Sequence, residues 1–85
     1  MDRILLTHAR PVGGLLVYAR TLRRNHHIRT FTIHAAERGG WEVREEENDQ
    51  LLARIVYTDW HRVERARSVM EARAAGLKSA GWTEP

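Results

Sequence analysis

The sequence contains no cysteine among its 85 residues. A disulfide framework, a zinc site built from thiolates and a cysteine nucleophile are therefore excluded. Long apolar segments are also missing: the longest uninterrupted run, Leu15 to Ala19, is far shorter than the roughly 20 residues that cross a bilayer. The sequence therefore predicts no transmembrane segment.

The residues that are present are typical of a small globular protein. Hydrophobic residues make up 42% and charged residues 29% of the chain, which are near the averages for folded domains. That hydrophobic content is well above the level at which a whole chain stays disordered. A chain of 85 residues has room for one small domain.

Positive charge is concentrated near the N-terminus. Residues 1–29 contain six arginines and a single acid, whereas residues 30–85 contain eight basic and ten acidic residues. The net charge of +3 favours an anionic partner such as nucleic acid or a membrane surface. Because much of this charge lies in a segment expected outside the fold, a merely solvated basic tail is the simpler interpretation.

Three strands are predicted after residue 27, because apolar and polar residues alternate there with the period of a strand that buries one face. The alternating runs cover residues 28–35, 41–44 and 51–58. Gly39 and Gly40 indicate a tight turn after the first run, and the acidic cluster at residues 45–50 indicates a second turn. Such short connections predict an antiparallel meander.

A C-terminal helix is predicted to begin near Trp60, with Asp59 or Thr58 as its N-cap. Apolar residues then recur at spacings of three and four and form a stripe that should face the sheet. This stripe consists of Val63, Ala66, Met70, Ala74 and Leu77. Gly81 suits a left-handed C-cap, with Trp82 packing back on the end of the helix.

Residues 1–27 are expected to form a basic extension that is flexible or weakly helical. A short amphipathic helix is predicted here, because apolar residues from Leu15 to Leu22 share one helical face. The segment has the arginine content of a targeting peptide but little serine. We therefore expect a cytoplasmic extension, with a targeting peptide, a membrane-surface helix or an early start codon as alternatives.

Together these elements predict an α+β fold in which a three-stranded antiparallel meander packs on one C-terminal helix, in the order β-β-β-α. The single domain is expected to span residues 28–85 and to fold without residues 1–27.

No pattern typical of catalysis or metal binding is found in the sequence. The histidines lack metal-ligand spacing, since His26 and His27 are adjacent while His34 and His61 lie on separate elements. The carboxylates at residues 45–49 crowd a predicted turn, which is too hydrated to favour paired acid and base roles. We expect no enzymatic activity, no metal and no cofactor.

Arginines are the candidate partner contacts, through phosphate or through an acidic protein surface. The simpler interpretation is a solvated charged face. The candidates are Arg20, Arg23, Arg24, Arg29, Arg62, Arg65 and Arg73. Nonspecific binding of nucleic acid is expected to depend mainly on the first four, because a mobile cationic tail can follow phosphates.

The stretches WEVREEEN (41–48), YTDWHRVERA (57–66) and AGW (80–82) resemble a family of small, uncharacterised bacterial α+β proteins. This resemblance implies a fold and transfers no activity to any residue. The expected function is a non-enzymatic binding or adaptor module in the cytoplasm, with nucleic acid or an acidic protein as its partner. The alternative is a homo-oligomerising domain without a nucleic-acid role, because so small a core would gain from a dimer.

Overall fold

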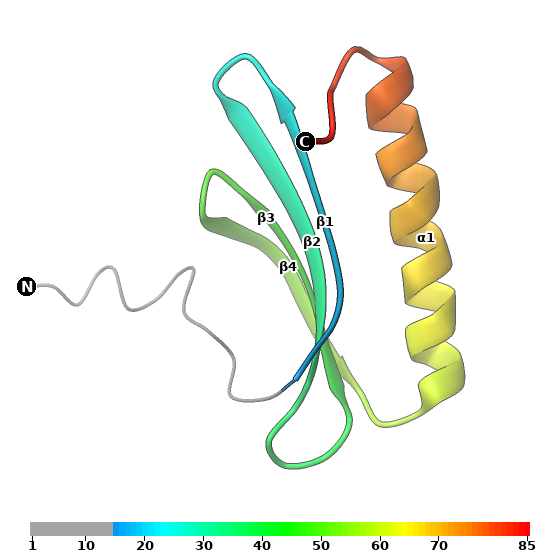
Figure 1. Cartoon of the computed structure of the whole chain (residues 1–85). Helices are drawn as coiled ribbons and strands as arrows, with labels where there is room; N and C mark the ends of the chain where they lie inside the picture. The colour runs from blue at the N-terminus through cyan, green and yellow to red at the C-terminus, as the bar shows by residue number, and fades with distance from the viewer. Residues whose placement is uncertain (1–14) are drawn as a thin grey trace, which may run out of the picture.

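The structure, a computed structural model, describes residues 15–85, which form an antiparallel sheet of four strands followed by one helix. Strand order in the sheet follows chain order. The elements are β1 (Leu16–Arg24), β2 (His27–Ala35), β3 (Trp41–Glu47), β4 (Gln50–Tyr57) and α1 (Trp60–Ser79). α1 covers one face of the sheet and runs along the strands (Figure 1). The α+β class, the antiparallel sheet and the C-terminal helix are confirmed.

β1 is a correction to the predicted fold. Residues 16–24 were expected to lie in a weakly helical extension, but they form a nine-residue strand paired with β2. The predicted three-stranded meander is therefore one strand short. Tyr18 and Leu22 fit a strand as well as a helix, because residues an even number of positions apart share one strand face. The rest of the predicted extension, residues 1–14, lies outside the described residues.

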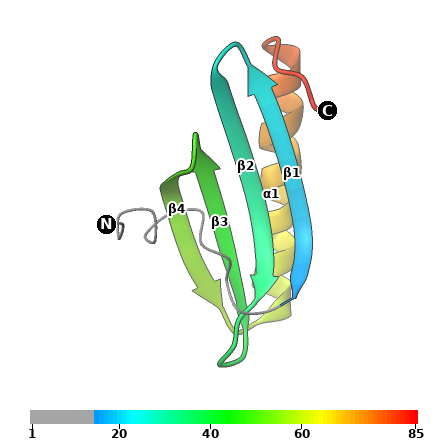
Figure 2. The same cartoon turned by 60° about the vertical axis from the view of Figure 1, so that its left-hand side comes forward.

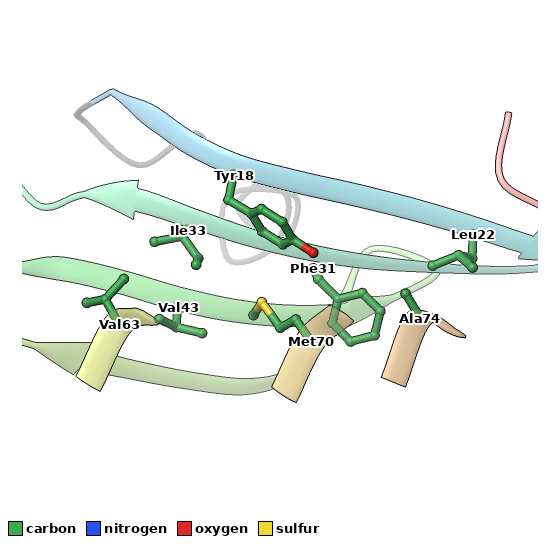
Figure 3. Close-up of a cluster of buried hydrophobic side chains, with 8 residues drawn as sticks. All are labelled: Tyr18, Leu22, Phe31, Ile33, Val43, Val63, Met70 and Ala74. Atoms are coloured by element: carbon green, nitrogen blue, oxygen red, sulfur yellow. The ribbon is translucent and has the colours of Figure 1, made fainter. Parts of the chain in front are cut away.

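The core lies between the sheet and α1 (Figure 3). Leu22 of β1 is fully buried there, so residues of the predicted extension belong to the domain core. The stripe on α1 faces the sheet as predicted: Met70 is buried, and Leu77 is half-buried. The eight buried hydrophobic side chains of residues 15–85 are Tyr18, Leu22, Phe31, Ile33, Val43, Val63, Met70 and Ala74.

Both predicted ends of α1 are confirmed. Asp59 is the N-cap, and its carboxylate accepts a hydrogen bond from the backbone N–H of His61 at 2.9 Å. At the other end Gly81 has φ of 101°, and the N–H of Trp82 donates to the carbonyl of Leu77 at 3.0 Å. This return of the chain places the C-terminal residues beside β1, where Thr83 forms a bridge with Arg23.

The acidic segment after Trp41 is a strand rather than a long turn. Asn48 and Asp49, with φ of 52° and 67°, make the turn alone. Glu45 lies within β3 and is buried against the helix side, which corrects its predicted place in a hydrated turn. Glu42 and Arg44 are also buried, and they lie on an interior strand flanked by β2 and β4.

The membership of β1 in the core can be tested with Leu22→Ala. Removing a fully buried leucine should lower the free energy of unfolding by about 2–5 kcal/mol. Leu16→Ala in the same strand is the control, because Leu16 is exposed and its replacement should change stability by less than about 0.5 kcal/mol. Urea denaturation measures both. Equal effects of the two substitutions would contradict the burial of β1.

Candidate functional site

The seven candidate arginines do not form one surface. Arg23 and Arg24 lie at the β1–β2 hairpin, and Arg62 and Arg65 lie at the start of α1. These two places are at opposite ends of the molecule (Figure 1). The other three candidates, Arg20, Arg29 and Arg73, lie between these ends and bind carboxylates of the same chain.

Arg20 ties β1 to the C-terminal residues and to α1. Its guanidinium donates two hydrogen bonds to Glu84, at 2.5 and 2.7 Å, and a third to Glu71 at 2.7 Å. Such forked arginine–carboxylate contacts are among the stronger hydrogen bonds in proteins. Arg20 lowers the pKa of Glu84 to about 2, and Glu84 in turn raises the pKa of Arg20.

Tyr18 extends this network into the core. Its hydroxyl donates to Glu71 at 2.8 Å, and this bond, followed by the contact with Arg20, lowers the pKa of Glu71. Burial, with Glu71 as the second cause, raises the pKa of Tyr18. The guanidinium of Arg67 lies 5.2 Å from the centre of the Tyr18 ring, which adds a cation–π contact. Arg20 therefore connects β1 to α1 and to the C-terminal residues of the same chain.

Arg29 and Arg73 share the buried carboxylate of Glu45. Arg29 donates to it at 2.7 Å from β2, and Arg73 donates to it at 2.6 Å from α1. Arg29 also bonds Glu47 at 2.8 Å and thereby lowers the pKa of that carboxyl. These contacts join the helix to the sheet, and they offset the charge of both arginines.

The remaining four candidates form no ion pair with any residue from 15 to 85. All four side chains are exposed. Arg23 and Arg24 stand beside the exposed His26 at the hairpin. Arg62 and Arg65 line a shallow hollow together with Tyr57 and Val69. The sequence alone could not show which arginines form ion pairs. The carboxylates that bind Arg20, for example, are 51 and 64 positions from it in the chain.

Within residues 15–85, no group of three or more histidines and carboxylates is arranged to hold a metal ion. His34 has a buried Nδ1 without a hydrogen-bond partner among these residues. The one helix of this part of the chain is not long and apolar enough to cross a membrane.

Comparison of the chain with known protein families, curated proteins and solved structures gave no match.

The Arg20 network predicts a loss of stability in acid. The folded-state pKa of Glu84, about 2, lies below its ordinary value of 4.5. Ionised Glu84 therefore stabilises the fold above pH 4.5, and this contribution is lost as the pH falls through about 2. Arg20→Gln removes the main cause of the shift, so its free energy of unfolding should depend less on pH over this range than that of the wild type.

Urea denaturation at several pH values between about 5 and 2 tests this expectation. Arg65→Gln is the matched control, because Arg65 binds no carboxylate of residues 15–85 and its replacement should leave the pH dependence unchanged. The same pH dependence in wild type and Arg20→Gln would show that the network does not stabilise the fold.

Proposed function

We propose that the chain is a non-enzymatic binding module that contacts an anionic partner, foremost the phosphate backbone of nucleic acid, through the β1–β2 hairpin. The observation that carries this proposal is the exposure of Arg23 and Arg24, whose charges no carboxylate of residues 15–85 offsets. An acidic protein surface is the alternative partner, because its carboxylates would also bind the two arginines. We place the activity in the cytoplasm of a bacterial cell as part of this proposal.

The hairpin has a shape suited to reaching a phosphate backbone. β1 and β2 are nine residues long, and their hairpin extends beyond the shorter β3–β4 hairpin (Figure 2). Arg23 and Arg24 are consecutive strand residues, so their side chains leave on opposite faces of the hairpin. Two guanidinium groups placed in this way could contact phosphates on both faces of the hairpin. Contacts with phosphates do not read the base sequence.

Charge elsewhere in the sheet favours contact at the hairpin. Asp49 in the neighbouring β3–β4 turn is exposed, and its negative charge repels phosphate. The paired arginines Arg20, Arg29 and Arg73 would have to leave their carboxylates to bind phosphate. We therefore propose nonspecific binding through a few contacts, which salt weakens.

Arg23→Gln/Arg24→Gln tests the hairpin. The double variant should weaken binding to a short DNA duplex, and the slope of log affinity against log salt should fall by up to about 0.9 for each phosphate that is no longer neutralised. Arg62→Gln/Arg65→Gln removes the same charge from the start of α1 and is the matched control. Fluorescence anisotropy at several salt concentrations measures both variants.

The outcomes separate the two partner chemistries. A larger effect of the control variant would move the site to α1 and contradict the hairpin proposal. Binding of polyglutamate in place of the duplex, with the same dependence on the hairpin arginines, would assign an acidic protein as the partner. Absence of binding to either probe at roughly 20 mM salt, where screening is weak, would refute the proposed function.

Self-association is the second candidate function. The observation that favours it is the exposed, apolar outer strand β4, in which Leu52 and Ile55 are each about half exposed.

A further inference from the structure

β4 is an edge strand that packs little of its surface. None of its eight residues is buried. Four of its aliphatic side chains are 42–53% exposed; these are Leu51, Leu52, Ile55 and Val56. Natural edge strands are normally short, charged or covered, because an exposed apolar edge invites pairing with another chain.

The opposite edge of the sheet is protected. The backbone of Arg23 in β1 exchanges two hydrogen bonds of 2.8 Å with Thr83, and the pairing of β1 with β2 is irregular between Leu16 and Tyr18. β4 pairs regularly with β3 from Ala53 to Tyr57. No backbone group of β4 bonds to residues 15–85 outside its pairing with β3. Its outer backbone groups therefore form a regular edge that no residue from 15 to 85 occupies.

The exposed apolar surface continues from β4 onto α1. A cavity of about 230 Å³ opens between the two elements and is lined by Ala53, Ile55 and Val69, among others. Val69 is 50% exposed, although it belongs to the side of α1 that faces β4. On the helix side of β4, exposed apolar side chains thus reach from an open strand edge to a helix, a feature typical of a protein–protein interface.

The charges at the two ends of β4 have opposite signs. Arg62 and Arg65 line the hollow beside Tyr57, at the end of the strand. Asp49, which is exposed, lies at the β3–β4 turn, where the strand begins. An antiparallel copy of β4 would bring the basic end of each chain alongside the acidic end of the other. The surface is therefore complementary to itself.

We propose that a second copy of this chain docks on the outer edge of β4. The two β4 strands pair in antiparallel fashion about a two-fold axis perpendicular to the sheet, and two four-stranded sheets join into one. Both helices then lie on the same face, with Val69 of each copy directed toward the axis. Such an isologous contact closes on itself and yields a dimer rather than a fibre.

Symmetry limits the register of this pairing. Opposed residues of an antiparallel pair share a face, so a two-fold axis perpendicular to the sheet requires one residue to stand opposite its own copy. Arg54 at that position would oppose two like charges, which is unfavourable. Ile55 is the central residue of the regular stretch from Ala53 to Tyr57. We therefore place Ile55 at the axis.

Single cysteines test the register directly, because the chain has none of its own. Opposed residues of an antiparallel pair have Cα atoms about 4.5–5.5 Å apart, which is within the range for a disulfide. Ile55→Cys should therefore form an intermolecular disulfide under mild oxidation. Leu52→Cys is the matched control: it is on the same strand and similarly exposed, but it lies off the axis and should cross-link far more slowly.

Sedimentation velocity of the full chain, up to roughly 100 µM, gives a second measurement in which no cysteine is needed. The wild type should sediment as a dimer, and Ile55→Asp should raise the dissociation constant at least about tenfold, because it places two like charges at the axis. Leu16→Asp, at an equally exposed leucine of β1, should leave the dimer intact. Circular dichroism of each variant checks that it is folded.

Each outcome decides the proposal. A monomer at every concentration, with Ile55→Cys cross-linking no faster than Leu52→Cys, would overturn it and assign the edge to a different protein or to another segment of the same chain. A dimer that Leu52→Cys cross-links faster would overturn the two-fold axis at Ile55. Arg23→Gln/Arg24→Gln should remain dimeric, so failure of the nucleic-acid proposal would leave this one standing.

Discussion

Within residues 15–85 one helix has to cover a sheet of four strands, and most features of this part of the chain depend on this mismatch. α1 has 20 residues and spans about 30 Å along its axis, so it matches the length of the strands. Across the strands the mismatch is large: a helix with its side chains is about 10 Å wide, whereas four strands are roughly 15 Å wide between their outer axes. α1 therefore seals the core over β1 to β3 and leaves the outer strand exposed.

Partly buried apolar side chains such as Trp41, Leu77 and Trp82 pack around this narrow core, and ion pairs link the elements at its margins. Arg20 joins Glu71 and Glu84 along β1, while Arg29 and Arg73 meet at Glu45 on the other side. Long arginine stems cover apolar surface while their guanidinium groups remain bonded at the rim. These three arginines, which in the sequence suggested an anionic partner, instead orient the helix on the sheet.

The same geometry separates the two surfaces on which we base function. The β1–β2 hairpin extends past the end of the sheet, and the edge of β4 lies along its side (Figure 2). A two-fold dimer through β4 would turn the two hairpins toward opposite ends of the joined sheet, because the paired strands run antiparallel. Such a dimer would present two separate basic hairpins, an arrangement suited to contacting two segments of one long anionic partner.

Elements with local signals can be predicted from the amino-acid sequence. The alternation in residues 28–35, the turn at Gly39 and Gly40, and the cap, stripe and end of α1 each depend on neighbours within a few positions. Tertiary structure alone decided the state of residues 16–24, because Tyr18 and Leu22 suit both a helix face and a strand face. Pairing with β2 selects the strand, because it gives the backbone N–H and C=O groups of this segment hydrogen-bond partners. A short isolated helix would be only marginally stable in water.

The division between free and paired arginines was also decided only by the tertiary structure. Arg20 and Arg23 are alike in sequence context, yet Glu71 and Glu84 reach the first and no carboxylate of residues 15–85 reaches the second. Likewise Glu45 is buried because β3 is interior and two arginines converge on it. Burial and charge pairing depend on residues far apart in the chain, so no local pattern determines them; only the packed sheet and helix do.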